Sequence, residues 1–130
     1  MPSGTRILFV EGNSALGMDL KALLTREGYI VCLTANGRKA LPHLADRSID
    51  IIIFDSDMQD MRNDMLREIL RSRPPTQRLP VIEIGSGTPP SDAGGIAYEF
   101  LKKPIVINEL ITNIERLMIR YAISRQHASD

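Results

Sequence analysis

The sequence is poor in several residue types, and each shortage narrows the classes of protein to which it can belong. Its 130 residues contain one cysteine, no tryptophan and two histidines. The single cysteine, Cys32, has no partner for an internal disulfide, and its place in an apolar, strand-like run favours a buried thiol in a reducing cytoplasm. With so few thiols and imidazoles, a zinc site lacks its usual ligands.

An excess of charge of one sign is also missing. Sixteen Lys and Arg residues balance sixteen Asp and Glu residues, so the formal net charge is zero. Nucleic acids and acidic membrane surfaces attract proteins with a positive excess, and we expect neither as a partner. No apolar stretch approaches the length of a membrane span, and the N-terminus lacks the layout of a signal peptide. The length and an apolar content of 43% fit one globular domain.

The most informative stretch runs from Ile49 to Asp57, where an isoleucine-rich segment ends abruptly in acids. Such a segment is typical of a strand that is buried on both faces of a parallel sheet. Ligands of open α/β sheets bind at the carboxyl ends of the strands, so Asp55 is a candidate for chemistry. The alternative is that Asp55 only caps the following turn or helix, and the residue type is equally compatible with that role.

Apolar runs and helical stripes alternate along the rest of the chain. Strands are expected at residues 6–10, 29–34, 49–55, 79–84 and 98–101. Helices are expected at residues 14–27, 35–45, 61–70 and 110–121, the second of them short or bent because it contains Pro42. Residues 85–95 are dense in Gly and Pro, so a helix between the fourth and fifth strands should be short or missing. A domain of residues 1–123 is then followed by a polar tail, residues 124–130, which we expect to be a frayed end or the start of a linker.

Strands that alternate with helices imply a parallel sheet with right-handed crossovers. Five such units in this length indicate an α/β, flavodoxin-like fold: a doubly wound five-stranded parallel sheet with strand order 2-1-3-4-5. The ligand crevice of that fold lies between strands one and three. Those strands end in Glu11 and Asp55, so the fold and the two carboxylates point to one place.

At this point the chain resembles the receiver domain of bacterial two-component response regulators, the CheY-like family. The resemblance covers residues 6–121. It rests on five features of the family pattern. An acid follows strand one (Glu11), an acid ends strand three (Asp55), and a methionine follows three residues later (Met58). Strand five carries an aromatic residue (Phe100), and a lysine–proline pair follows that strand (Lys103-Pro104). Each match is weak alone, but together they occur in the right order and at the right spacing.

The resemblance implies a role for each residue. In the family, the strand-three Asp accepts a phosphoryl group from a histidine kinase or phosphotransfer protein, assisted by Mg²⁺ and the lysine. Asp55 would thus be phosphoacceptor and metal ligand, Lys103 the phosphate contact, and Glu11 and the Asp57 carbonyl further Mg²⁺ ligands. The resemblance also implies a cytoplasmic signalling domain rather than an enzyme, with an output domain or partner protein. In a simpler interpretation, Lys103 is an ion-pair partner that joins strand five to strand three.

Several positions depart from the family pattern. Gly12 stands where receivers have a second acid, so Mg²⁺ binding should be weak or lost. Gly85 stands where the family has a Thr or Ser whose hydroxyl turns to the phosphoryl group. Ser86 follows it, but strand alternation should point Ser86 elsewhere unless the strand ends early. Without that hydroxyl, we expect Phe100 to fill the core rather than to act as a switch.

Two hypotheses therefore stay open. Asp55 and Lys103 favour a phosphoacceptor receiver. Gly12 and Gly85 favour a pseudo-receiver, which keeps the fold and binds proteins without phosphorylation. An enzyme of flavodoxin-like fold is disfavoured, because residues 11–14 lack the glycine spacing of a dinucleotide loop and no histidine lies near a strand end.

Overall fold

The computed structural model describes residues 4–46, 48–57, 63–73, 79–88 and 98–129. In these segments strands and helices alternate as predicted. The strands are β1 (Arg6–Val10), β2 (Ile30–Thr34), β3 (Ile51–Asp55), β4 (Val81–Gly85) and β5 (Tyr98–Lys102). The helices are α1 (Ser14–Arg26), α2 (Gly37–Ala40), the 3₁₀ helix η1 (Leu41–Ala45), α3 (Asn63–Arg71) and α4 (Ile107–Ser129).

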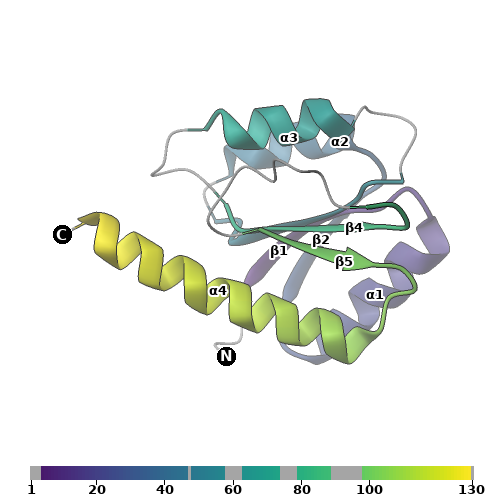
Figure 1. Cartoon of the computed structure of the whole chain (residues 1–130). Helices are drawn as coiled ribbons and strands as arrows, with labels where there is room; N and C mark the ends of the chain where they lie inside the picture. Colours follow the sequence, from purple (N-terminus) through teal and green to yellow (C-terminus); the bar gives the residue numbers. More distant parts are fainter. Residues whose placement is uncertain (1–3, 47, 58–62, 74–78, 89–97, 130) are drawn as a thin grey trace.

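The strands form one parallel sheet in the order β2-β1-β3-β4-β5, which confirms the predicted fold class and strand order. Helices α2 and α3 cover one face, and α1 and α4 cover the other (Figure 1). Val10 of β1 pairs with Phe54 of β3, so these two strands end side by side. The register therefore brings the next residue of each strand, Glu11 and Asp55, to the same edge of the sheet.

Strand β3 is buried on both faces, as its isoleucine-rich sequence predicts, and all five of its residues are buried. Ile51 and Ile53 pack in the core that includes residues of α1 and α4. Ile52 and Phe54 pack in the core on the α2 and α3 side. Each fully buried side chain of this size stabilises the fold by about 1.5–3 kcal/mol. Packing on both faces holds Asp55 rigidly at the end of the strand.

A tight turn joins β1 to α1 and fixes the position of Glu11. The backbone N–H of Glu11 donates to the Thr34 carbonyl at the end of β2, over 2.9 Å. Asn13 then caps α1, because its side-chain oxygen accepts a hydrogen bond of 3.0 Å from the Leu16 N–H. The turn thus has a backbone hydrogen bond before it and a helix cap after it, which together hold Glu11 in place.

The structure refines three local predictions. The second helix is short, as expected, and passes into the 3₁₀ helix that contains Pro42. Helix α4 runs to Ser129, beyond the predicted end near residue 121, because no Gly or Pro interrupts the helix after that point. The backbone of the tail is thus helical as far as Ser129, while a frayed end or a linker role stays a prediction. Cys32 is half-buried rather than buried, with its sulfur 3.6 Å from Nδ1 of His43.

Two expectations fall outside the described residues. The short or missing helix between the fourth and fifth strands concerns residues 89–97, and the methionine of the family pattern is Met58.

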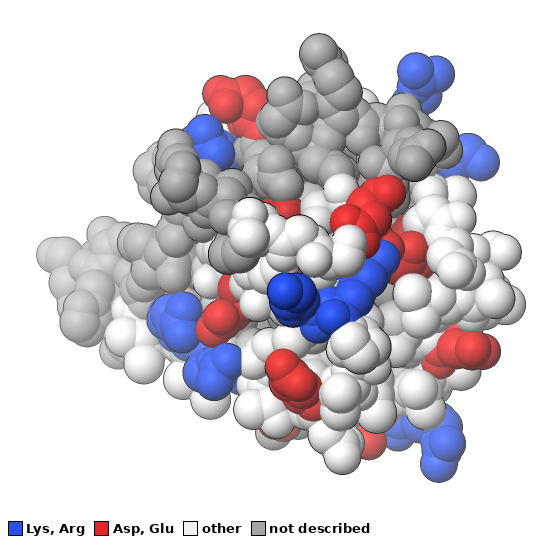
Figure 2. All heavy atoms as spheres, turned by 45° about the vertical axis from the view of Figure 1, so that its right-hand side comes forward, with Lys and Arg blue, Asp and Glu red and all other residues white. Residues whose placement is uncertain are grey.

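On the surface shown in Figure 2, Lys and Arg side chains are interspersed with Asp and Glu side chains. Among the described helices, none combines the length and the apolar character needed to span a membrane.

Candidate functional site

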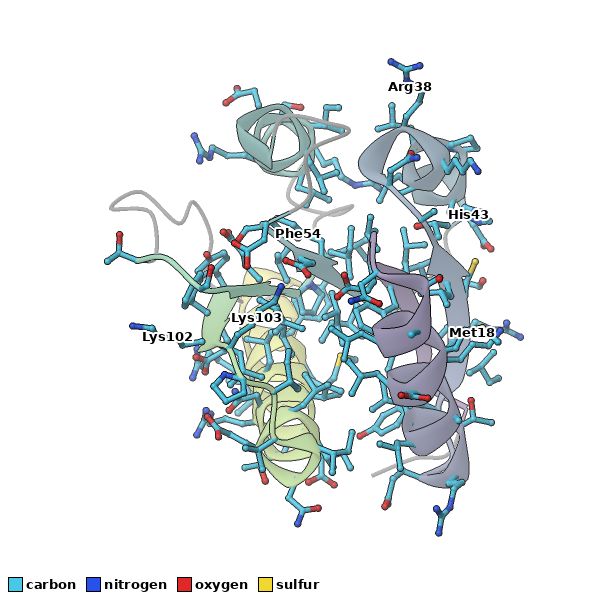
Figure 3. The ribbon with its side chains drawn as sticks, turned by 90° about the vertical axis from the view of Figure 1, so that its right-hand side faces the viewer. Met18, Arg38, His43, Phe54, Lys102 and Lys103 are labelled. Carbon is cyan, nitrogen blue, oxygen red and sulfur yellow. The ribbon has the colours of Figure 1, made fainter. Side chains whose placement is uncertain are left out.

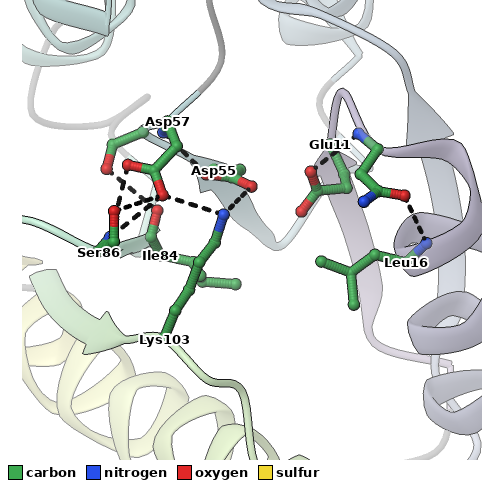
Figure 4. Close-up of polar contacts among 9 residues, drawn as sticks. Glu11, Leu16, Asp55, Asp57, Ile84, Ser86 and Lys103 are labelled. Atoms are coloured by element: carbon green, nitrogen blue, oxygen red, sulfur yellow. Dashed lines mark hydrogen bonds and ion pairs between the residues drawn. The ribbon is translucent and has the colours of Figure 1, made fainter.

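A lysine bridges two carboxylates at the carboxyl edge of the sheet (Figure 4). The Lys103 ammonium lies 2.7 Å from Oδ2 of Asp55 and 3.1 Å from Oδ2 of Asp57. The Asp55 side chain is only 4% exposed, whereas that of Asp57 is 37% exposed. The strong contact is therefore with the buried carboxylate at the end of β3, and the weaker one is with a carboxylate at the rim.

The end of β5 places this lysine. Gly85 pairs with Lys102, and the N–H of Lys103 donates to the Gly85 carbonyl over 2.9 Å. Figure 3 shows the consequence: Lys102 points away from the sheet into solvent, whereas Lys103 reaches along the carboxyl edge toward β3. Burial works to lower the pKa of Lys103, but its hydrogen bonds to Asp55 and Asp57 outweigh burial and raise the pKa above its usual value. Lys103 therefore stays charged at neutral pH.

Asp57 contributes its side chain to the site, which the sequence analysis missed. Only its backbone carbonyl was expected to take part. Its N–H donates to Oδ1 of Asp55 over 2.8 Å, and its carboxylate accepts a hydrogen bond of 3.0 Å from the Ser86 hydroxyl. Burial opposes ionisation of Asp57, but hydrogen bonds from Lys103 and Ser86 lower the pKa of this carboxyl below its usual value. Asp57 thus stays anionic and shares the lysine with Asp55.

Ser86 points into the site because β4 ends at Gly85. Strand alternation predicted that Ser86 would point elsewhere unless the strand ended early; β4 runs one residue beyond the predicted end, to Gly85, and Ser86 is the first residue after it. Beyond the strand, side-chain alternation no longer applies. Both the N–H and the hydroxyl of Ser86 donate to the Asp57 carboxylate, over 3.2 and 3.0 Å. Ser86 therefore orients Asp57 rather than the buried acid Asp55.

Glu11 is buried on the other side of Asp55, at 3% exposure. Its Oε2 accepts a hydrogen bond of 3.1 Å from the Asn13 N–H. Its Oε1 is buried and has no hydrogen-bond partner among the described residues. Burial, with a smaller contribution from the neighbouring Asp55 carboxyl, raises the pKa of Glu11 to about 7. Glu11, whose Oε1 has no hydrogen-bond partner among the described residues, therefore lies beside the Asp55 carboxylate, as Lys103 does.

The remaining predicted residues lie next to this cluster. Phe100 is half-buried on β5, and its ring lies against Gly85 of β4. A Cβ atom built on Gly85 would stand 3.3 Å from the ring and would collide with the Ser56 hydroxyl. The core-filling role of Phe100 stays a prediction, because the contact places its ring beside the site without showing what it does.

Comparison with known proteins identifies the architecture. The family description "Response regulator receiver domain" matches residues 7–115 of the chain. The chain belongs to the response regulator receiver family. Receiver domains are signalling domains of two-component systems, so the resemblance noted in the sequence is confirmed at the level of the family.

Individual receivers are moderately similar to this one. The crystal structure of the receiver domain of the hybrid histidine kinase CckA has 30% sequence identity and a TM-score of 0.72, and covers 87% of this chain and 98% of that one. The chemotaxis response regulator CheY4 of Vibrio cholerae has 23% identity and a TM-score of 0.75, with 88% and 99% coverage, and supports the fold alone.

Two longer relatives match this receiver over only part of their length. The DNA-binding transcriptional regulator NtrC of a Bradyrhizobium strain is 34% identical over 125 residues, which are 91% of this chain and 25% of the relative. The TorCAD operon transcriptional regulatory protein TorR of Escherichia coli is 26% identical over 132 residues, with 92% and 53% coverage. The chain thus spans between a quarter and about half the length of these relatives.

The donor types at this edge suit Mg²⁺, with one acid fewer than the family pattern has. The donors are all oxygens, which Mg²⁺ prefers: the carboxylates of Glu11 and Asp55 and the Asp57 carbonyl. The partnerless Oε1 of Glu11 is an atom that a cation would satisfy. Among the described residues, no group of three or more His, Cys, Asp or Glu side chains is arranged to hold a metal. With Gly12 in place of an acid, the expectation is a weak site.

Proposed function

We propose that this receiver domain is a phosphoacceptor, with Asp55 as the residue that is phosphorylated. The observation that carries the proposal is the 2.7 Å ion pair between the buried Asp55 carboxylate and Lys103. A solvent-exposed carboxylate is a common cap, but a buried one at a sheet's ligand edge, with a fixed cation beside it, is suited to phosphoryl transfer.

The transfer step is a direct displacement at phosphorus. One Asp55 carboxylate oxygen attacks the phosphorus of a phosphohistidine, a new O–P bond forms, and the N–P bond breaks. The histidine nitrogen leaves with the electron pair of that bond and takes up a proton from solvent. Negative charge on the phosphoryl oxygens is the main obstacle, so the catalytic requirement is positive charge and hydrogen-bond donors held in place beforehand.

Each residue of the site contributes to that requirement. Lys103, anchored by two carboxylates, contributes positive charge at the position of the incoming group. The N–H of Asp57 holds Oδ1 of Asp55, which leaves Oδ2 on the side of the lysine. Mg²⁺, held by Glu11, Asp55 and the Asp57 carbonyl, would supply further positive charge to the phosphoryl oxygens when bound.

The partners follow from the proposed reaction. The phosphoryl donor is a cytoplasmic histidine kinase or a phosphotransfer protein, and the recipient of the signal is an output domain or a partner protein. The similarity to NtrC and TorR, both named as transcriptional regulators and both longer than this chain, supports an output domain. The domain boundary near residue 123 and a linker beyond it belong to the same proposal.

A beryllofluoride titration with Mg²⁺, followed by amide NMR, tests the proposal. Beryllofluoride mimics a phosphoryl group on an aspartate. We expect saturable shifts around Asp55, Lys103 and Ser86 in the wild type and none in Asp55→Asn. Asp19→Asn is the matched control, because Asp19 is an exposed aspartate on α1, and it should behave as the wild type. A wild-type spectrum that does not move would refute the acceptor role and leave the pseudo-receiver.

A further inference from the structure

The Ser56 hydroxyl occupies the space that a side chain at residue 85 would fill. Its Oγ lies well within 3.0 Å of the point where a Cβ on Gly85 would stand, a separation that real Cβ atoms essentially never show. The ring of Phe100 lies 3.3 Å from the same point. Glycine at 85 therefore leaves room for a hydroxyl that comes from β3 instead of from β4.

The Ser56 hydroxyl donates to a carbonyl that has a second donor. Its Oγ donates to the Ile84 carbonyl over 3.1 Å, and that carbonyl already accepts a shorter bond of 2.7 Å from the Ser56 N–H. If the hydroxyl turns away, the carbonyl keeps its backbone partner, so the cost of an unsatisfied buried group is avoided. The Ser86 hydroxyl, at the same edge, is held by the anionic Asp57.

A phosphoryl group on Asp55 would bring several strong acceptor oxygens to this edge of the sheet. Among the described residues, the Lys103 ammonium and the Asp57 N–H donate to Asp55. Ser56, the residue after Asp55, places its hydroxyl next to the end of β4. This hydroxyl lies at the same edge of the sheet as Asp55, in the space that Gly85 leaves open.

We propose that Ser56 is a positioning residue of this receiver: its hydroxyl turns from the Ile84 carbonyl to the phosphoryl group on Asp55, and Gly85 is the residue that admits it. The proposal rests on the acceptor role of Asp55. It assigns to Ser56 the contact that the family pattern assigns to a hydroxyl on position 85, which this chain lacks.

A double-mutant cycle of unfolding stability, which needs no phosphorylation, tests whether the Ser56 hydroxyl occupies the space beside Gly85. Gly85→Ala should lower the urea midpoint by more in the wild type than when Ser56→Ala is also present, because only in the wild type must the Ser56 hydroxyl turn away from the new Cβ and give up its 3.1 Å bond to the Ile84 carbonyl. Equal losses in both backgrounds would show that Ser56 and position 85 do not share this space, and would overturn the proposal.

Beryllofluoride affinity, measured by NMR with Mg²⁺, tests the functional half. Ser56→Ala should weaken binding by about tenfold, the usual effect of losing a hydrogen bond to a charged group. Ser56→Ala combined with Gly85→Ser returns a hydroxyl to the same space and should recover most of the affinity. Ser72→Ala is the matched control, because the Ser72 hydroxyl also donates to a backbone carbonyl, that of Ile69 over 3.0 Å, but lies at the far end of α3.

The outcomes separate this proposal from the acceptor role. If the wild type binds beryllofluoride and Ser56→Ala binds equally well, Asp55 remains an acceptor and the role of Ser56 is refuted. If the double variant stays as weak as Ser56→Ala, the hydroxyl does not act from the space beside Gly85, which also contradicts the proposal. A wild type that binds no beryllofluoride refutes both the acceptor role and this inference.

Discussion

The shared lysine predicts two ion pairs of unequal strength. At the 2.7 Å that separates Lys103 from Asp55, and with an effective dielectric constant of about 20, the Coulomb attraction is about 6 kcal/mol. Desolvation of the buried carboxylate cancels much of it, and a hydrogen bond between charged groups typically contributes about 1.5–3 kcal/mol net. The contact with Asp57 is longer, at 3.1 Å, and its carboxylate is more exposed, so we expect less than about 1 kcal/mol there.

Two double-mutant cycles measure this difference. The first combines Asp55→Asn with Lys103→Met, and the second combines Asp57→Asn with Lys103→Met, each followed by urea unfolding and circular dichroism. Asparagine keeps the shape and the acceptor oxygen, so the cycle isolates the charge. Coupling energies of about 1.5–3 and below about 1 kcal/mol are expected. The partly exposed pair Arg116–Glu99, at 3.3 Å, is the control and should also give less than about 1 kcal/mol. Equal couplings, or a first coupling as small as the control, would refute the reasoning.

Three further predictions concern stability and metal binding. In metal-free buffer, wild-type stability should fall as pH rises from 4.5, the ordinary pKa of Glu11, to about 7, because the folded state holds the proton more tightly than the unfolded state. The total loss of unfolding free energy is at most about 3 kcal/mol. Because glutamine does not titrate, Glu11→Gln should be more stable than the wild type near pH 8 but not near pH 5, as measured by urea unfolding. Gly12→Asp should strengthen Mg²⁺ binding by about tenfold or more in calorimetric titration, because it adds the missing anionic ligand. Tight, stoichiometric Mg²⁺ binding by the wild type would contradict the expectation of a weak site. Ile53→Ala should cost about 2–5 kcal/mol of unfolding free energy, whereas a loss below about 1 kcal/mol would contradict the packing described for β3.

The fold was predictable because its signals are local and repeat along the chain. The apolar run before Asp55 has the pattern of a strand buried on both faces, and the alternation of strands with helices leaves few parallel-sheet topologies. The strand order then places Glu11 and Asp55 at one edge without any knowledge of side-chain contacts. The end of α4 was less predictable, since residues 124–129 are mostly polar but contain no Gly or Pro to stop a helix.

The details of the site were less predictable because they depend on where one strand ends. Ser86 faces Asp57 only because β4 stops at Gly85, and a shift of one residue would turn Ser86 away. The side chain of Asp57 could have been suspected from its charge and its position two residues after Asp55. By contrast, the closeness of Ser56 to Gly85 involves two neighbouring strands, and no spacing in the sequence reports it.

Phosphorylation of Asp55 is the central claim, and mass spectrometry of the intact domain tests it most directly. The domain is incubated with Mg²⁺ and a small-molecule phosphodonor such as phosphoramidate, which removes any dependence on the cognate kinase. The account predicts a mass increase of one phosphoryl group in the wild type and in Asp19→Asn, and none in Asp55→Asn. An unmodified wild type, or an Asp55→Asn variant that gains the group equally well, would contradict the account.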